Sequence, residues 1–484
     1  MNPRPLLMIL LLSLAACSAR ERTTELSAID PFGGYRYGSL SKSAPKQPSK
    51  TFVVMTFSGG GTRAAALATG ALEGMASSII DDHGTPINLA EQIDIISSVS
   101  GGSVAAAYYG LHGQEGLPQF TANFLKRNVQ GHLIGEALLP WTWFRLATPS
   151  YARIDALRDY FDDNVFDHAT YDSLLNPKPA PQSRRPYVVL NAADMSNGAV
   201  FSFTQDQFDL ICSDLAKLPV ADAVAASAAF PVALTALTLK NRSPCKAQSD
   251  ALKDELSGWK HSDLAKREGP PRPVSMTKAL ESQAEHPGRY RRGVIELGYL
   301  NEENNAPYIQ LLDGGISDNL GLTNPLTLMT STDYTPSILS RINKGEIDRI
   351  IVVVVNARSE PDNSYGASAG PPGLISTLLT TIGTPIDGTS FAMLERLQAI
   401  LTDAGAEAVE TKVVPVDFDF ITDPGCRRRF KNIGTSWGLD SGEVDALLGL
   451  GSAMVRKAAT DLGGSTLGKS PTVDEACSTL AAVD

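Results

Sequence analysis

The sequence lacks the features that mark several large classes of protein. It has no internal repeat and no Cys-x-x-Cys motif or Cys/His cluster, so a zinc site is not expected. No run of Lys and Arg extends beyond Arg427 to Arg429, and the formal net charge is −11, which leaves nucleic-acid binding with little support. What remains is globular composition: 484 residues, 43% hydrophobic and 20% charged, which is enough to build a large core.

No early apolar run is long enough to span a bilayer as a helix, but a short one, Leu6–Leu14, opens the chain. It has the form of a signal-peptide core. The tetrapeptide LAAC that ends at Cys17 resembles the processing box of bacterial lipoproteins. This resemblance implies that residues 1–16 are removed, that Cys17 is acylated, and that the chain is anchored in the cell envelope. Since Ser18 and not an aspartate follows, the resemblance favours the outer membrane, facing the periplasm. A plain secretory signal is the alternative.

Cysteine is scarce as well, with five residues in the chain. Without Cys17, an even number remains, and in an oxidising compartment four cysteines are compatible with two disulfides in three connectivities. We favour Cys212–Cys245 and Cys426–Cys477, because each pair closes a local loop. Four buried free thiols are the alternative.

The rest of the chain divides by composition. Residues 17–50 are polar and rich in Ser and Pro, which predicts a flexible tether. Residues 51–465 contain no linker that would separate independent domains. Within them, residues 241–290 are charged and contain proline, which predicts a surface insertion with broken helices. Residues 466–484 are weakly patterned and read as a weakly ordered tail.

The body alternates strand and helix patterns. Thr51–Phe57 is a β-branched and aromatic strand pattern that enters a glycine loop and then a helix. Ile93–Tyr109 repeats strand, turn and helix, and Ile347–Asn356 has the composition of a buried central strand. Two strand–helix units in succession predict an α/β fold with a parallel sheet and helices on its faces.

Ser100 lies at the turn of the second unit, in the sequence Ser98-Val-Ser100-Gly-Gly. Such an elbow presents a hydroxyl at the end of a strand, beside the first amides of a helix. We therefore interpret Ser100 as a catalytic nucleophile. An ordinary glycine-containing turn is the alternative, because the strict elbow has glycine where this chain has Ser98.

Histidine, the usual base for such a serine, is rare and poorly placed. None of the six histidines follows Asp313, so the familiar order of serine, acid and histidine is absent. Asp313, in the turn Asp313-Gly-Gly after the short strand Tyr308–Leu312, is the better candidate base. A carboxylate partly buried there could have a pKa high enough to take the Ser100 proton. By itself, Asp-Gly-Gly could equally be a simple turn.

The first glycine loop, Gly59-Gly60-Gly61, offers successive backbone N–H groups at the start of a helix, which suits an oxyanion. Arg63 follows and could pair with a phosphate or another anion. A nucleotide loop is disfavoured because the Gly-Lys-Ser/Thr ending is missing.

Four blocks in this order resemble the patatin-like phospholipase family over residues 51–325. They are Ser58–Arg63 for the oxyanion loop, Ser98–Gly102 for the elbow, Ala225–Pro231 for an alanine-serine-proline block, and Asp313–Gly315. The resemblance implies a three-layer α/β/α fold, a Ser100–Asp313 dyad without histidine or cofactor, and hydrolysis of lipid esters through an acyl-enzyme. The substrate would be a phospholipid or another acyl-ester lipid, reached from a membrane. Protein partners are not indicated.

Three points stay open. A generic esterase or thioesterase, or a non-catalytic envelope lipoprotein that binds lipid or protein, would be compatible with much of this pattern. The segment around Trp141 and Trp143, beside Arg145, suits a membrane interface, a lid at a substrate entrance, or a buried helix contact. Residues 360–484 match no motif.

Overall fold

The computed structural model describes most of the chain. The residues it describes are 20–30, 33–40, 49–148, 151–177, 185–231, 233–248, 287–300, 306–330, 338–359, 409–468 and 471–483. The expected signal peptide, Cys17 and most of the expected insertion lie outside the described residues.

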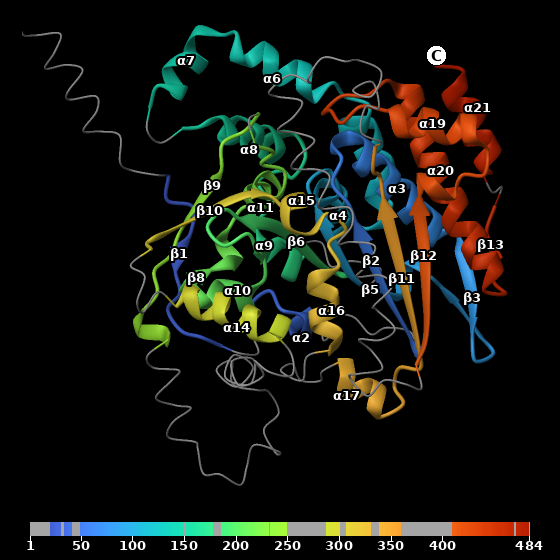
Figure 1. The fold of residues 1–484 in the computed structure, drawn as a ribbon, viewed down its shortest axis with the longest axis horizontal. Helices are drawn as coiled ribbons and strands as arrows, with labels where there is room; N and C mark the ends of the chain where they lie inside the picture. The colour runs from blue at the N-terminus through green and yellow to red at the C-terminus, as the bar shows by residue number, and fades with distance from the viewer. Residues whose placement is uncertain are drawn as a thin grey trace, which may run out of the picture.

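A mixed sheet forms the centre of the molecule (Figure 1). Its strands are β2 (Thr51–Phe57), β5 (Ile93–Val99), β6 (Tyr187–Asp194), β7 (Val200–Ser202), β9 (Leu237–Lys240), β10 (Tyr308–Asp313), β11 (Arg349–Asn356) and β12 (Glu410–Asp417). Their order is β12-β11-β2-β5-β6-β10-β9, with β7 beside β6. Neighbours from β12 to β6 are parallel, whereas β10 runs antiparallel to β6 and β9. Asp313 therefore lies at the end of a strand that runs opposite to the strand before Ser100.

The parallel strands are buried on both faces, as their sequences predict. In β11 every residue after Arg349 is buried, and β2 and β5 are buried throughout. Continuous apolar, β-branched strands of this kind require helices on both sides.

Helices supply that cover. They include α3 (Gly61–Ala76), α4 (Gly101–His112), α8 (Arg153–Asn164), α11 (Val220–Ser227), α14 (Pro287–Tyr299), α16 (Thr323–Thr330) and α20 (Ser441–Asp461). α3 packs on β11 and α20, α4 on β5 and β6, α11 on β6, and α16 on β5. The predicted α/β/α layering with a mostly parallel sheet is confirmed.

Further helices and a second sheet surround this core. They are α2 (Tyr37–Leu40), α5 (Leu117–Phe120), α6 (Val129–Ala137), α7 (Pro140–Leu146), α9 (Tyr171–Leu175), α10 (Gln205–Leu210), α15 (Gly315–Asp318), α17 (Ile338–Asn343), α19 (Pro424–Asn432) and α21 (Val473–Ala481), with β3 (Ser78–Asp82), β4 (Thr85–Asn88) and β13 (Ser465–Thr466) in a separate small sheet. Among the described helices, none combines the length and the apolar character needed to cross a membrane.

The prediction of a flexible tether is wrong for the described part of residues 17–50. β1 (Thr24–Glu25) pairs with β8 (Ser213–Asp214), and Tyr35 is 1% exposed. Arg36 is buried against the carboxylates of Asp206 and Asp209. Composition suggested disorder because the segment is polar, but its arginines find acidic partners that lie far along the sequence.

The prediction of a weakly ordered tail is likewise wrong for residues 471–483. α21 begins with a capping box in which the Thr472 hydroxyl and the Glu475 carboxylate each accept a backbone N–H. The helix packs against α20, and its Leu480 side chain is buried.

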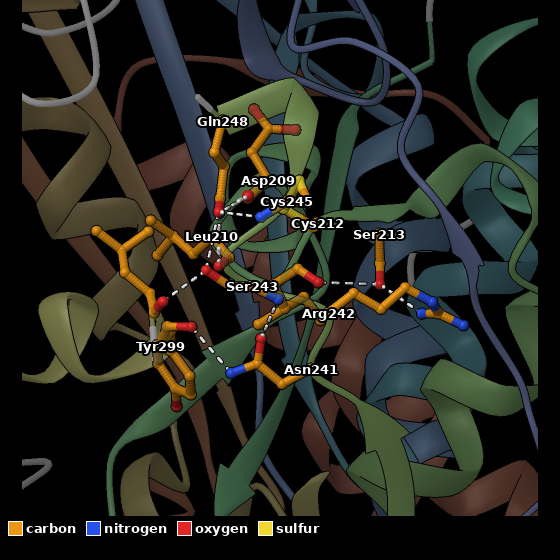
Figure 2. Close-up of a disulfide and its surroundings, with 12 residues drawn as sticks. Asp209, Leu210, Cys212, Ser213, Asn241, Arg242, Ser243, Cys245, Gln248 and Tyr299 are labelled. Atoms are coloured by element: carbon orange, nitrogen blue, oxygen red, sulfur yellow. Dashed lines mark hydrogen bonds between the residues drawn. A yellow bond between two sulfur atoms is a disulfide. The ribbon is translucent and has the colours of Figure 1, made fainter. Parts of the chain in front are cut away.

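The structure contains the disulfides Cys212–Cys245 and Cys426–Cys477, the two pairings that the loop lengths favour. Figure 2 shows the first, with Gln248 bridging back to the carbonyl oxygens of Asp209 and Leu210. The second joins α19 to α21. Each disulfide therefore fixes an outer segment to the body of the fold.

Candidate active site

Ser100 lies at the elbow between β5 and α4, in a backbone conformation that serine rarely adopts. Its φ is 52°, and its side chain is 7% exposed. A positive φ at a residue with a side chain is strained and persists only where the surroundings enforce it. Here the buried strand before it and the helix after it, which begins at Gly101, enforce the turn.

Asp313 meets Ser100 from the end of β10. Ser100 Oγ donates a hydrogen bond to Asp313 Oδ2 at 2.7 Å, and the backbone N–H of Gly315 donates to Oδ1 at 2.8 Å. The first distance suits a nucleophile and its base, and the second bond holds the carboxylate in orientation. Residues 213 positions apart thus form one polar pair.

The burial of Asp313 sets its acidity. The side chain is 6% exposed, and this burial raises the pKa of the carboxyl to about 6, although the hydrogen bonds from Ser100 and Gly315 act to lower it. A group with this pKa is mostly ionised at neutral pH yet basic enough to accept a proton.

Ser227 supports the elbow from below. Its Oγ accepts the backbone N–H of Ser100 at 2.8 Å and donates to the carbonyl of Asn191 at 2.6 Å. The backbone N–H groups of Asp313 and Gly314 also donate to the carbonyls of Ala229 and Ser227. The sequence pattern assigned no role to the alanine-serine-proline block. In the structure, this block is hydrogen-bonded both to the Ser100 elbow and to the Asp313 turn.

Ser98, where the strict elbow has glycine, fits without crowding the turn. It is fully buried, and its hydroxyl contacts Ser103 Oγ at 3.1 Å and the Val189 carbonyl at 3.3 Å. The extra side chain is thus absorbed into a buried hydrogen-bonded row of serines beneath the nucleophile.

The glycine loop lies against the nucleophile, but its three N–H groups differ. A Cβ on Gly59 would lie 3.3 Å from the Ser100 Cβ, and the Gly59 N–H donates to Asn319 Oδ1 at 3.3 Å. Within the described chain, the N–H groups of Gly60 and Gly61 donate no hydrogen bond. Two free donors therefore remain at the start of α3, and the prediction that Gly59 also contributes is not supported, because its donor is occupied.

Close backbone contact explains the glycine after the nucleophile. A Cβ on Gly101 would lie 2.0 Å from the carbonyl oxygen of Gly61. Any side chain there would push the glycine loop away from Ser100.

The prediction that Arg63 contacts a phosphate or another anion is wrong. Its side chain is 2% exposed and points into the protein, where it donates to the carbonyls of Ala357 and Ile433 and to Thr435 Oγ1. Burial lowers the pKa of this guanidinium to about 10. With its donors taken by neutral acceptors, Arg63 instead braces the start of α3 against the C-terminal region.

Two other contributions were not apparent from the sequence. Asn319, just after α15, joins the glycine loop to the Asp313 turn, since its Oδ1 also lies near Gly315. Ser436 accepts the N–H of Thr62 at 2.9 Å. Through the second contact, the C-terminal region, which carries no recognisable motif, helps to hold the start of α3 in place.

The sequence model of the family described as patatin-like phospholipase matches residues 55–326, more than half of the chain. The chain belongs to the patatin-like phospholipase family. The matched region includes Ser100, Asp313 and the glycine loop, and the membership supports a lipid acyl hydrolase in general.

Among solved structures, this patatin-like chain is similar to human GIVD cytosolic phospholipase A2, with 10% sequence identity and a TM-score of 0.40. The match covers 92% of this chain and 64% of that one, so the chain spans less than two thirds of its length. No sequence among the curated proteins matches.

Proposed function

We propose that this protein is a serine hydrolase that cleaves the carboxylic esters of phospholipids or lysophospholipids through a Ser100–Asp313 dyad. The observation that carries the proposal is the 2.7 Å hydrogen bond from Ser100 Oγ to a buried carboxylate. It occurs on a strained elbow beside the two free N–H groups of Gly60 and Gly61. Nucleophile, base and oxyanion donors are the parts that acyl transfer requires.

In the first half-reaction, Asp313 accepts the Ser100 proton as Oγ attacks the ester carbonyl. The carbonyl oxygen becomes an oxyanion, held by the N–H groups of Gly60 and Gly61. Collapse of the tetrahedral intermediate breaks the bond to the alcohol. The proton on Asp313 passes to that alcohol, and the acyl group stays on Ser100.

In the second half-reaction, water attacks the acyl-enzyme. Asp313 takes a proton from the water, the same two N–H groups hold the new oxyanion, and the proton returns to Ser100 Oγ as the fatty acid leaves. The raised pKa of Asp313, about 6, supports both roles. The carboxylate is ionised at neutral pH, but it is a stronger base than an exposed aspartate would be.

We also propose that Cys17 is acylated and anchors the protein in the cell envelope, on the periplasmic face of the outer membrane. Two disulfides support an oxidising compartment. Labelling with palmitate tests the anchor: the label should be absent from a Cys17→Ala variant, and retention of the label there would contradict it.

A fluorophosphonate probe tests the nucleophile. Full-length protein should gain one covalent label on Ser100, the label should be lost in Ser100→Ala, and it should persist in Ser196→Ala, which changes an exposed serine on another turn. Equal labelling of the Ser100→Ala variant would refute the proposal. Lipid binding without labelling would favour the non-catalytic reading.

Rates on diacyl lipid, monoacyl lipid, p-nitrophenyl ester and thioester substrates then separate the chemical alternatives. A phospholipase or lysophospholipase should prefer the lipids. Faster cleavage of the short soluble ester or of the thioester would indicate a generic esterase or thioesterase.

A further inference from the structure

The hairpin formed by α6 and α7 exposes an unusual concentration of large apolar side chains. They are Ile134, Leu138, Trp141, Trp143 and Phe144, which are 55%, 74%, 58%, 67% and 77% exposed. Other exposed large apolar side chains in the described chain are scattered over many elements. We call these five residues the aromatic face. All five lie within residues 134–144, and a concentration of exposed large apolar side chains marks a binding site more often than singly scattered ones do.

The aromatic face is held outward by polar contacts on the inner side of the hairpin. Thr142 is 7% exposed, and its hydroxyl donates to the Glu136 carbonyl at 2.7 Å. The Arg145 guanidinium donates to Asp159 at 2.8 Å and lies over the Tyr151 ring, 3.9 Å from its centroid. With α7 fixed in this way on α8, its tryptophans and Phe144 point to solvent.

One end of the hairpin is attached beside the glycine loop. The N–H of Gln130 in α6 donates to the carbonyl of Trp437 at 3.0 Å. The neighbouring residue, Ser436, accepts the N–H of Thr62 at the start of α3. The glycine loop and α6 are therefore connected through a single short segment.

Beyond the other end, α8 is connected to the strand that carries Asp313 through α11, which packs on both α8 and β10. The N–H of Ile154, at the start of α8, donates to the Thr235 hydroxyl at 3.3 Å. Thr235 follows the segment in which Ala229 accepts the N–H of Asp313. Figure 1 shows α6 and α7 beyond the carboxyl ends of the parallel strands. The aromatic face thus belongs to the edge of the molecule that carries the candidate site.

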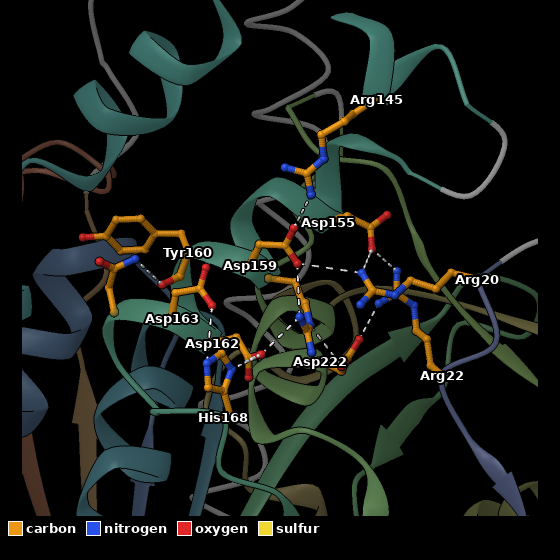
Figure 3. A network of polar contacts seen from close by, with 12 residues as sticks. Arg20, Arg22, Arg145, Asp155, Asp159, Tyr160, Asp162, Asp163, His168 and Asp222 are labelled. Carbon is orange, nitrogen blue, oxygen red and sulfur yellow. Dashed lines mark hydrogen bonds and ion pairs between the residues drawn. The ribbon is translucent and has the colours of Figure 1, made fainter. Parts of the chain in front are cut away.

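The described chain also begins at this place, as Figure 3 shows. Arg20 lies 3.4 Å from an oxygen of Asp155 and 3.8 Å from one of Asp159, the carboxylate that also binds Arg145. Arg22 is buried against Asp155. Cys17 is three residues before Arg20, a distance that extended chain covers in about 11 Å at most.

From these observations we propose that the aromatic face is a docking surface for a phospholipid bilayer. This inference rests on the proposed function, because a lipid hydrolase must meet its substrate at a membrane. Trp and Phe side chains favour the boundary between headgroups and acyl chains. The point where the described chain starts places an acylated Cys17 within reach of the same face, so that anchor and aromatic face engage one membrane.

The test uses full-length protein with Cys17→Ser in every arm, so that acylation cannot supply the binding. Ser100→Ala is added for the binding assay, so that the vesicles stay intact. The vesicles contain phosphatidylethanolamine and phosphatidylglycerol. Replacing Trp141, Trp143 and Phe144 by Ser should weaken co-flotation with vesicles on the order of 100-fold, from the lost apolar burial of three aromatic side chains.

Two matched variants control this result. Val413→Ser with Leu467→Ser removes exposed apolar side chains from β12 and from beside β13, away from the hairpin, and should leave co-flotation unchanged. Trp141→Phe with Trp143→Phe keeps the apolar character and should retain most of the binding. If the Ser variant binds vesicles as well as its parent, the proposal is overturned. If the substitutions instead abolish a dimer and leave vesicle binding intact, the face is a self-association surface.

Activity measurements separate this proposal from the proposed function. With Ser100 present, the ratio of vesicle hydrolysis to soluble-ester hydrolysis should fall at least about tenfold in the Ser variant, in line with its weaker partitioning. An unchanged ratio in an active enzyme would overturn the docking surface and leave the hydrolase standing. If vesicle binding depends on the aromatic face but the protein cleaves no ester, the docking surface stands and the proposed hydrolase activity is refuted.

Discussion

The candidate site and the aromatic face, two neighbouring regions at one edge of the sheet, invert the usual distribution of side chains. The site encloses polar groups, with Ser100 and Asp313 only 7% and 6% exposed, whereas the hairpin exposes aromatic ones, with Trp143 and Phe144 at 67% and 77%. Either arrangement costs stability by itself. Their proximity supports the two proposals together, in which the hairpin contacts the lipid and the site cleaves it.

Glycine shows the same contrast on the backbone. A Cβ on Gly101 would lie 2.0 Å from a backbone oxygen, while a Cβ on Gly135, in α6, would meet no atom within 4 Å. The site depends on close approach of two turns. The hairpin is constrained by a few polar contacts, and we expect it to tolerate change.

The largest effect is expected at the dyad. Asp313→Asn keeps the shape of the side chain but removes its basicity, so kcat on a soluble ester should fall roughly 10⁴-fold. A thermal melt should show that the variant is folded, because a neutral amide is no harder to bury than a carboxylate. Activity within tenfold of the parent would show that Asp313 is not the base.

Next comes a pair of identical substitutions in the two regions. Gly101→Ala should lower kcat by about 100-fold or more and reduce the free energy of unfolding, because the new methyl group displaces the glycine loop. Gly135→Ala should leave kcat unchanged and stabilise α6 by about 0.5–1 kcal/mol. Similar behaviour of the two variants in kinetics and denaturant unfolding would remove the contrast between the regions.

A smaller effect is expected at Asn319, a positioning residue. Asn319→Ala removes the acceptor of the Gly59 N–H, so the glycine loop should be less well placed and kcat should fall about tenfold with KM little changed. Asn164→Ala, at the exposed end of α8, serves as the control. A rise in KM at constant kcat would indicate that Asn319 binds substrate instead.

The mildest perturbation is pH. Because the pKa of Asp313 is about 6 and the carboxylate is the active form, kcat/KM on a soluble ester should be flat above that pH. Below it, the rate should fall about tenfold per pH unit. A profile that stays level down to about pH 4 would not fit a base with a raised pKa.

The sheet and the pairing of serine with aspartate could be predicted because their signals are local. A buried strand such as β11 needs only β-branched residues, and Ser100 and Asp313 each lie where a strand enters a glycine turn. The fold then brings the ends of these strands to one edge. No long-range information was needed to name the candidates.

Other features depend on partners distant in sequence, which a local pattern does not reveal. Arg63 resembles an anion-binding arginine in sequence, but in the structure it donates to the carbonyls of Ala357 and Ile433. The polar N-terminal segment resembles a tether in sequence, but in the structure Arg36 forms an ion pair with Asp206. Asn319 has no motif, and its role follows only from the position of Gly59.

The most direct test of the central claim is to trap the acyl-enzyme. Full-length protein is mixed with a p-nitrophenyl acyl ester, quenched in acid, and digested for mass spectrometry. The account predicts that the peptide containing Ser100 gains the mass of the acyl group, and that Ser100→Ala gains none. An acyl group on another residue, or one that persists in Ser100→Ala, would contradict it.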